Sequence, residues 1–230
     1  MRLLRWLPVL HLFLVLFAVQ ALGSSAEGKR LRVLALHGYM GNGNVMCESF
    51  NSWDPAILKL VQFTCLDAPF ADKYYKNAYS WLNFDSDRSR SKIDQSLAYL
   101  FDFMRQTGPY DGVWGFSQGG VMAGLLTGVQ AKKMDIWGRK SGDLPPLRFT
   151  VVHAGGYVPG LLEYIFSPPL ETKSFHIIGN YDPVRQGGIN FLSKWQNPMV
   201  AYVDMPHTYL TSQYMDDNLK WSLEYFLKNV

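Results

Sequence analysis

The sequence predicts a doubly wound α/β fold, in which a largely parallel sheet of about six strands is flanked by helices. Short apolar runs alternate along the chain with segments of helical periodicity, as expected when helices connect parallel strands. The segment Gly115-Phe-Ser117-Gln-Gly119 joins one of these runs to a helix-forming segment. That context indicates a sharp strand-to-helix turn at the carboxyl edge of the sheet.

The expected elements follow in regular order from residue 31. Strands are predicted at residues 31–36 and 62–66, in the apolar run before Ser117, and at 149–153, 174–178 and 199–203. Helices are predicted at residues 45–60 and 92–107, after Ser117, and at 187–194 and 211–228. Residues 70–90 have no clean period but are rich in aromatic side chains. Residues 70–90 either cover a pocket or form an irregular surface segment.

The start of the chain has the pattern of a secretory signal peptide. Arg2 and Arg5 precede an apolar run, and small residues follow it. We expect residues 1–23 to be a cleaved leader and residues 24–230 to form a single domain. Cleavage after Ala26 and an uncleaved membrane anchor are the alternatives. A leader places the protein in the secretory pathway, either secreted or in an organelle lumen. Whether Cys47 and Cys65 form a disulfide there stays open at the level of sequence.

Charge excludes one class of function. The chain has 230 residues and a formal net charge of +3, of which Arg2 and Arg5 in the leader contribute two units. The remaining domain is close to neutral, so there is no electrostatic basis for binding nucleic acid.

Ser117 is the candidate nucleophile because it lies at the centre of a Gly-x-Ser-x-Gly elbow. Such a turn forces the serine into a strained backbone conformation. Gly115 and Gly119 remove side chains that would clash with the neighbouring strand and helix. The alternative is a glycine-rich turn that only packs tightly or holds a phosphate. A base and an acid later in the chain favour the first interpretation.

Candidate partners for Ser117 follow the fifth and sixth predicted strands. A serine nucleophile needs a histidine base and a carboxylate that fixes the tautomer of that histidine. Asp182 and His207 supply these groups in the chain order Ser, Asp, His. Asp204 is the alternative acid and His153 the alternative base.

Acyl transfer also requires donors directed at the oxygen on which charge develops. The backbone N–H groups of Gln118 and Tyr39 are the candidates, and Met40 is the alternative to Tyr39. His37, just before this loop, is interpreted as structural. Met40, Trp81 and Tyr157 are expected to line the substrate pocket, because the loops that carry them leave the same edge of the sheet as Ser117.

Several segments together resemble the family of serine hydrolases (FSH), a family of esterases with the α/β-hydrolase fold. The resemblance rests on Leu36-His-Gly, Leu66-Asp-Ala-Pro, the run from Gly108 to Gly119, and Phe175-His-Ile-Ile-Gly-Asn-Tyr-Asp. It implies the strand order 2-1-3-4-5-6 and a small, cofactor-independent carboxylesterase with Ser117, Asp182 and His207 as its triad. The chain departs from the family at Met205-Pro206, where relatives usually have two glycines.

We therefore expect a serine carboxylesterase that favours apolar acyl groups of short to medium length and needs no cofactor or metal. A lipase, a thioesterase or an acyltransferase of the same fold is the enzymatic alternative. A hydrolase-like binding protein that no longer turns over is the alternative from another class. The expected partner is a small-molecule ester, and a membrane only if the leader is an uncleaved anchor. The sequence does not predict the oligomeric state.

Overall fold

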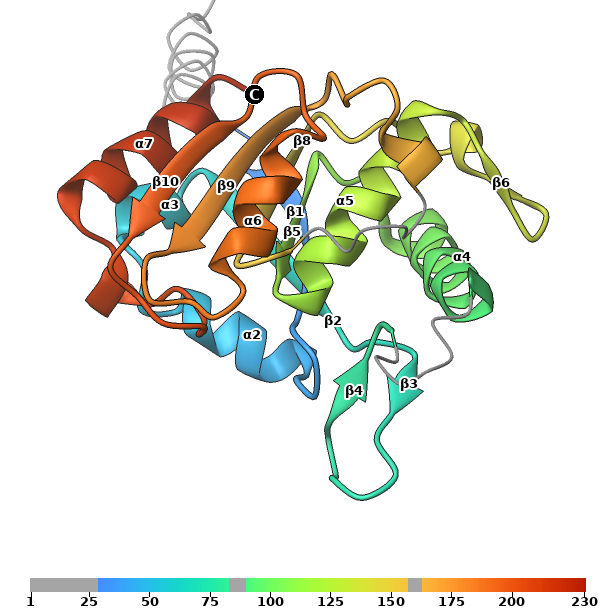
Figure 1. Ribbon diagram of the computed structural model, residues 1–230, viewed down its shortest axis with the longest axis horizontal. Coiled ribbons are helices and arrows are strands. Elements are labelled where there is room, and N and C mark those ends of the chain that lie inside the picture. The colour runs from blue at the N-terminus through green and yellow to red at the C-terminus, as the bar shows by residue number, and fades with distance from the viewer. Residues whose placement is uncertain (1–28, 83–89, 157–162) are drawn as a thin grey trace, which may run out of the picture.

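A parallel sheet of six strands lies at the centre of the computed structural model, which describes residues 29–82, 90–156 and 163–230 (Figure 1). The strands are β1 (Leu31–Leu36), β2 (Val61–Leu66), β5 (Gly112–Phe116), β8 (Phe149–His153), β9 (Lys173–Gly179) and β10 (Met199–Val203). Their order across the sheet is β10-β9-β8-β5-β1-β2, which confirms the predicted order. β1 therefore lies between β2 and β5, and its carboxyl end meets that of β5.

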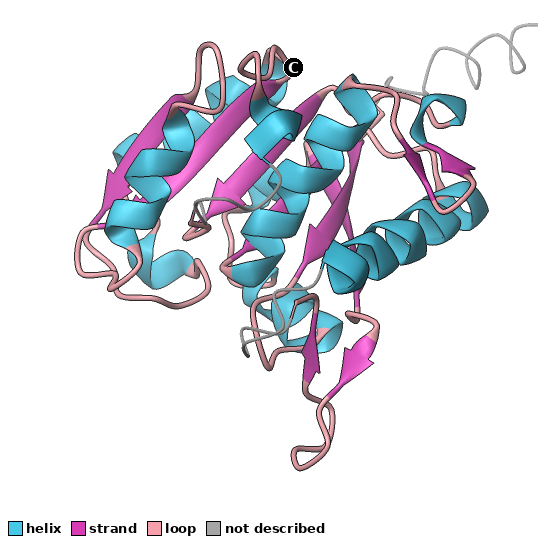
Figure 2. Ribbon diagram, turned by 45° about the vertical axis from the view of Figure 1, so that its right-hand side comes forward, coloured by secondary structure: helices cyan, strands magenta, loops and turns pink. Residues whose placement is uncertain are grey.

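Helices cover both faces of the sheet (Figures 1 and 2). They are α2 (Gly43–Phe50), α3 (Pro55–Leu58), α4 (Arg90–Thr107), α5 (Gln118–Ala131), α6 (Arg185–Leu192) and α7 (Asp217–Lys228). Side chains alternate along each strand, so Leu34 and Leu36 face one apolar core with α4, α5 and α6. Val33 and Ala35 face a second core with α2, α3 and α7.

Two predicted helices are wrong in extent, and polar caps explain both differences. The helix expected at 45–60 is divided into α2 and α3, because Asp54 precedes Pro55 and its side chain accepts a hydrogen bond from the Ala56 N–H. The helix expected at 211–228 begins only at Asp217, where the Asp216 carboxylate caps the first turn. A short 3-10 turn, Ser212–Tyr214, precedes it. The other predicted boundaries agree to within two residues.

In the part of the chain that the structure describes, two small antiparallel hairpins lie outside the central sheet. One joins β3 (Phe70–Ala71) to β4 (Tyr79–Ser80) within the aromatic stretch, and it projects from the body in Figure 1. The other joins β6 (Asp135–Ile136) to β7 (Arg139–Lys140). Within residues 29–82, 90–156 and 163–230, no helix combines the length and apolar character needed to cross a membrane.

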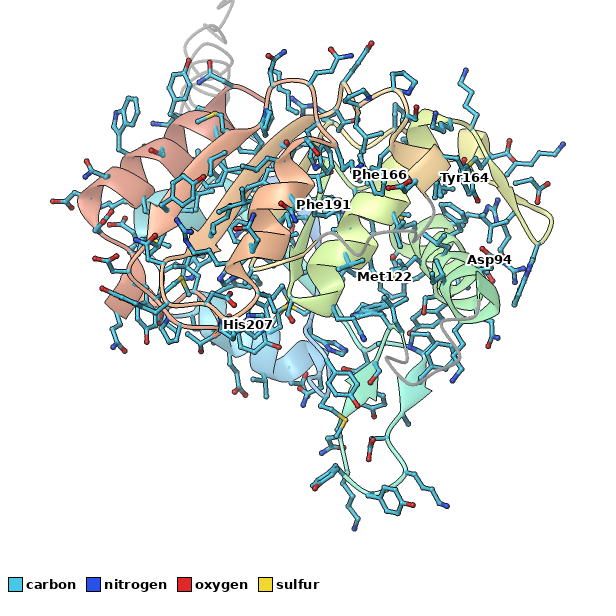
Figure 3. The ribbon with its side chains drawn as sticks, viewed as in Figure 1. Asp94, Met122, Tyr164, Phe166, Phe191 and His207 are labelled. Carbon is cyan, nitrogen blue, oxygen red and sulfur yellow. A yellow bond between two sulfur atoms is a disulfide. The ribbon has the colours of Figure 1, made fainter. Side chains whose placement is uncertain are left out.

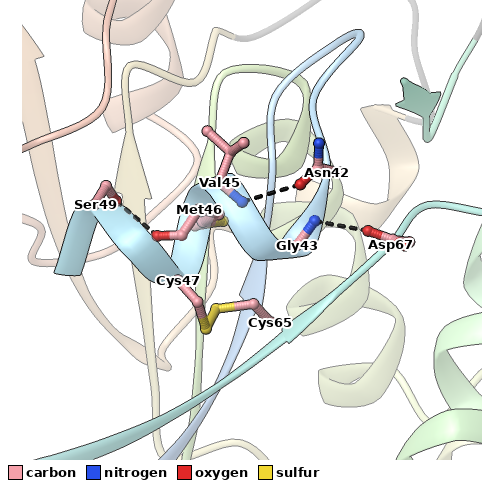
Figure 4. Close-up of a disulfide and its surroundings, with 8 residues drawn as sticks. All are labelled: Asn42, Gly43, Val45, Met46, Cys47, Ser49, Cys65 and Asp67. Atoms are coloured by element: carbon pink, nitrogen blue, oxygen red, sulfur yellow. Dashed lines mark hydrogen bonds between the residues drawn. A yellow bond between two sulfur atoms is a disulfide. The ribbon is translucent and has the colours of Figure 1, made fainter. Parts of the chain in front are cut away.

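A disulfide joins α2 to the edge strand β2, which settles the state of the two cysteines (Figure 4). Cys47 and Cys65 are separated by 18 positions in the chain. Close by, the Gly43 N–H at the start of α2 donates to Asp67 Oδ1 at 2.7 Å. These two links fix the helix that directly follows the loop after β1.

We predict that removing this cross-link with a Cys47→Ala/Cys65→Ala double variant destabilises the protein by about 3 kcal/mol. The disulfide restricts the unfolded chain, and a closed loop of this length is expected to contribute about that much. Urea denaturation of the variant and of the oxidised and reduced wild-type protein measures the effect. A denaturation midpoint that neither the variant nor reduction shifts would contradict it.

Candidate active site

Ser117 lies at the turn between β5 and α5 in a backbone conformation that L-residues rarely adopt, with φ 54° and ψ −117°. The turn is held by a hydrogen bond of 2.9 Å from the Ser117 N–H to the His153 carbonyl. A Cβ atom added at Gly115 would lie 2.1 Å from the Gly119 carbonyl oxygen, and one added at Gly119 would lie 2.1 Å from the Leu36 carbonyl oxygen. Both positions therefore require glycine, as the elbow motif predicts.

Hydrogen bonds connect Ser117 to a histidine and an aspartate from two other loops. His207 Nε2 lies 2.8 Å from Ser117 Oγ, and His207 Nδ1 lies 2.8 Å from Asp182 Oδ2. A carboxylate only accepts, so Nδ1 carries the hydrogen and the lone pair of Nε2 faces the serine hydroxyl. This is the arrangement in which an imidazole can take the serine proton.

Asp182 and His207 come from the ends of β9 and β10. The Asp182 side chain is almost fully buried, and its second oxygen accepts from the Val184 N–H at 2.7 Å. His207 is partly exposed, and it lies in the lower part of the body in Figure 3. One partner is thus held rigidly, and the other meets the solvent.

The two residues before His207 differ from the usual glycines, and the first is buried while the second is exposed. Met205 is buried in the core that contains α7. Its carbonyl accepts from the Tyr181 N–H at 3.2 Å, which ties the loop of His207 to the loop of Asp182. Pro206 accepts from the Thr208 N–H at 2.9 Å. Met205-Pro206 is therefore compatible with the position of His207 beside Ser117.

The alternative acid and base lie apart from this series. Asp204 is exposed, and its Oδ1 accepts from Asn180 Nδ2 at 2.6 Å. His153 is buried beside the Phe116 ring, with centroids 4.9 Å apart, and its Nε2 has no partner among the described residues. Burial, and secondarily the nearby His207, lowers the pKa of His153 to about 3. His153 is therefore neutral, and it makes its contact with Ser117 through the backbone.

His37 is bonded within the first loop, in agreement with its structural interpretation. Its Nδ1 donates to the Gly38 carbonyl at 2.7 Å, and its Nε2 accepts from the Ala68 N–H at 3.0 Å. Burial lowers the pKa of His37, and the Gly38 contact and the Asp67 charge oppose that change. The neutral ring is the form that can both donate and accept here.

The proposed oxyanion donors lie on two neighbouring segments. Gln118 is the first residue of α5, and the first N–H groups of a helix have no acceptor within it. The loop after β1 approaches Ser117 so closely that a Cβ atom at Gly38 would be 3.3 Å from Ser117 Cβ. Tyr39 follows directly, half exposed, and Met40 has a positive φ of 58°. Their assignment as donors stays a prediction.

The residues predicted to line the pocket differ in burial and in whether the structure describes them. Trp81 is fully buried, and its Nε1 donates to the His37 carbonyl at 2.9 Å. Met40 is partly buried in the loop beside Ser117. Tyr157 lies outside the described residues. Among the residues that the structure describes, no group of three or more His, Cys, Asp or Glu side chains is arranged to hold a metal ion.

Two contacts of the site did not follow from the sequence interpretation. The Phe116 ring lies 5.1 Å from the His207 ring and 4.4 Å from the Tyr209 ring, centroid to centroid, and so packs against the imidazole. The Gln118 side chain is buried and bonded to the backbone of Trp81 and Leu82. The sequence predicts a role only for the Gln118 backbone N–H. A buried side-chain amide nevertheless requires hydrogen-bond partners.

Comparison with known proteins finds a matching family model and several relatives. A family model described as serine hydrolase (FSH1) matches residues 26–188. The chain is 28% identical over 196 residues to Esterase CG5412 of Drosophila melanogaster, covering 73% of this chain and 67% of that protein. It is 25% identical over 174 residues to Esterase GA18864 of Drosophila pseudoobscura pseudoobscura, covering 68% of this chain and 57% of that protein. The chain thus spans about two thirds or less of the length of these relatives.

A solved structure supports the fold. The acyl-protein thioesterase 2 of Zea mays superposes with a TM-score of 0.58 at 20% sequence identity, over 86% of this chain and 94% of that one. The α/β-hydrolase fold predicted from the sequence is confirmed.

We predict that Asp182→Asn lowers kcat by on the order of a thousandfold or more, because an amide cannot hold the His207 tautomer or balance an imidazolium. Asp204→Asn is the matched control. Asp204 directly follows the neighbouring strand, β10, and its carboxylate accepts from Asn180 rather than from His207. Steady-state ester hydrolysis by both variants measures the difference. A greater loss in Asp204→Asn would assign the acid role to Asp204.

We also predict that buried His153 makes the protein less stable in acid. Its folded-state pKa is about 3, below the unfolded value, so unfolding takes up a proton between those two pH values. Above pH ~6.5 His153 is neutral in both the folded and the unfolded state, so its burial does not lower the stability. Below that pH the free energy of unfolding falls by about 1.4 kcal/mol for each pH unit. Urea denaturation at pH 7.5, 6 and 5 should show a shallower pH dependence in His153→Gln. Identical slopes in the variant and wild type would contradict the prediction.

Proposed function

The chain belongs to the serine hydrolase (FSH1) family, and from that membership we propose that it is a carboxylesterase with Ser117 as its nucleophile. The observation that carries the proposal is the continuous series of hydrogen bonds from Ser117 Oγ through His207 to Asp182, with 2.8 Å at each step. The names of the two Drosophila relatives, both called esterases, support the same class of reaction.

In the proposed acylation step, Ser117 Oγ attacks the ester carbonyl carbon while its proton passes to His207 Nε2. Asp182 stabilises the resulting imidazolium through Nδ1. The carbonyl oxygen becomes an oxyanion, for which the Gln118 and Tyr39 backbone N–H groups are the candidate donors. Collapse of this intermediate breaks the bond to the alcohol, which leaves with the proton from Nε2.

Deacylation reverses these roles with water. Neutral His207 accepts a proton from a water molecule as that water attacks the acyl carbon. The second tetrahedral intermediate expels Ser117 Oγ, which recovers its proton, and the carboxylic acid is released. Apart from the ester and water, these steps use only Ser117, His207, Asp182 and the backbone donors.

We propose that apolar acyl groups of short to medium length are preferred. The segments that follow β2 and β8 in the chain are rich in aromatic residues and contain few cationic ones, which supports this preference. Each buried methylene contributes about 0.8 kcal/mol, so a few carbons can change specificity ten- to a hundredfold. A series of p-nitrophenyl esters from acetate to octanoate tests it, and a profile that is highest at acetate would contradict it.

Two other functions remain distinguishable by experiment. A thioesterase, lipase or acyltransferase would use the same acyl-enzyme and differ in the leaving group or in the acceptor. A binding protein without turnover would need no intact hydrogen-bond series, so the bonded geometry of Ser117, His207 and Asp182 favours an enzyme.

We propose the secretory pathway as the location of the protein. The pattern of the first 23 residues supports this, and so does the Cys47–Cys65 disulfide, since disulfides persist mainly in oxidising compartments. N-terminal sequencing of the protein from a eukaryotic host tests both cleavage and the anchor alternative.

We predict that Ser117→Ala lowers ester hydrolysis by at least about a thousandfold and abolishes labelling by a fluorophosphonate, while the fold is retained. Ser193→Ala, at an exposed serine next to α6, is the matched control. Full labelling of the Ser117→Ala protein would refute the nucleophile. Labelling of wild type without hydrolysis of any ester would favour the acyltransferase or the binding protein.

A further inference from the structure

The side chain of Gln118 is fully engaged although it has no part in the reaction steps above. It is 1% exposed. Its Oε1 accepts from the Trp81 N–H at 2.6 Å and from the Leu82 N–H at 3.1 Å, and its Nε2 donates to the Leu82 carbonyl at 2.7 Å. The residue after Ser117 therefore clamps the backbone at the end of the β3–β4 hairpin.

The same hairpin is bonded to the loop after β1. Trp81 Nε1 donates to the His37 carbonyl at 2.9 Å, and the Tyr79 N–H donates to the Gly41 carbonyl at 2.9 Å. Asn42 Nδ2 donates to the Asn77 carbonyl at 2.9 Å. Residues 77–82 thus contact the loop of Tyr39 on one side and the elbow of Ser117 on the other.

Residues 77–82, which bridge the two loops, are also bonded to α4. Ser96 Oγ on α4 donates to the Trp81 carbonyl at 2.6 Å, so the backbone N–H, the carbonyl and the indole N–H of Trp81 are all bonded. Trp81 and Ser96 are buried, and hydrogen bonds away from water hold their geometry strongly. The segment has little freedom to move independently of either neighbour.

This coupling matters because the two candidate oxyanion donors lie on different loops. Both N–H groups must point at one oxygen from about 2.7–3.1 Å, and displacement by about 1 Å can cost up to a hundredfold in rate. Loops are otherwise the most mobile parts of a fold. A covalent chain fixes Gln118 to Ser117, whereas the position of Tyr39 relative to Gln118 depends on the packing of β1 against β5 and α5 and on the contacts of residues 77–82.

We propose that the Gln118 side chain is a positioning residue that, through residues 77–82, sets the loop of Tyr39 relative to the Ser117 elbow. The inference rests on the proposed function for its kinetic consequence, but not for the coupling itself. The Gln118 side-chain amide acts on catalysis only through this alignment. The Gln118 backbone N–H, in contrast, would contact the substrate oxygen.

The test compares Gln118→Met with Thr127→Val. Methionine keeps the volume of the side chain and removes all three hydrogen bonds. Thr127 lies on the same helix, is also buried, and bonds the Ala123 carbonyl at 2.8 Å and Thr150 Oγ1 at 2.6 Å, so valine there removes buried hydrogen bonds far from the bridge. Both variants should lose stability, and only one should misalign the loop.

The first readout is amide hydrogen exchange, which needs no activity. We expect peptides that cover residues 38–42 to exchange several times faster in Gln118→Met than in wild type, and to be unchanged in Thr127→Val. Equal exchange in the two variants would overturn the proposal. Faster exchange in a protein that hydrolyses no ester would uphold the coupling and reject the proposed function.

The second readout is kinetic. We expect Gln118→Met to lower kcat on p-nitrophenyl acetate roughly ten- to a hundredfold, with little change in KM, and to weaken inhibition by a trifluoromethyl ketone in proportion. Such a ketone forms a tetrahedral adduct with serine and so reports the alignment of the donors. A kcat no lower than that of Thr127→Val would overturn the proposal.

A double-mutant cycle identifies the route of the coupling. Trp81→Phe removes the indole donor to the His37 carbonyl and keeps an aromatic ring. If the bridge transmits the effect, the double variant with Gln118→Met should lose little more activity than either single variant. Strictly multiplicative losses in the double variant would refute the route through Trp81.

Discussion

The close approach of the start of α5 to the end of β1 is the constraint on which the site depends. It leaves no space for a side chain at Gly119, whose added Cβ atom would lie 2.1 Å from the Leu36 carbonyl oxygen. In the same turn Ser117 has φ 54°, a conformation that costs on the order of 1–3 kcal/mol. Packing of the buried helix offsets that cost. As a result, the serine, a helix N-terminus and the loop of Tyr39 meet at one edge of the sheet.

Neutral buried groups, rather than ion pairs, organise this edge. His37 donates with Nδ1 and accepts with Nε2, which only an uncharged imidazole can do, and burial lowers its pKa accordingly. Gln118 and Trp81 also form their contacts as uncharged side chains. The Asp182 carboxylate is shared between His207 Nδ1 and the Val184 N–H. The contacts named here that align the loops are therefore formed between uncharged groups.

Much of the fold and the meeting of Ser117, Asp182 and His207 could be predicted from the sequence. Parallel strands bring their carboxyl ends to one edge, so residues that follow three strands must lie close together. The break at Asp54 and the cap at Asp216 differ from the predicted helices because each depends on an aspartate side chain that accepts from a nearby backbone N–H, which apolar periodicity does not show. The Cys47–Cys65 bond and the contacts of Gln118 depend on distances between segments, which a pattern along one chain does not contain.

A crystal structure of the protein after reaction with a fluorophosphonate tests the central claim most directly, namely that Ser117 attacks and that two backbone N–H groups receive the developing charge. We predict a covalent bond between Ser117 Oγ and phosphorus. We also predict a phosphoryl oxygen about 2.7–3.1 Å from the backbone nitrogens of Gln118 and Tyr39. An adduct on any other residue would contradict the nucleophile, and a phosphoryl oxygen directed away from both nitrogens would contradict the oxyanion site.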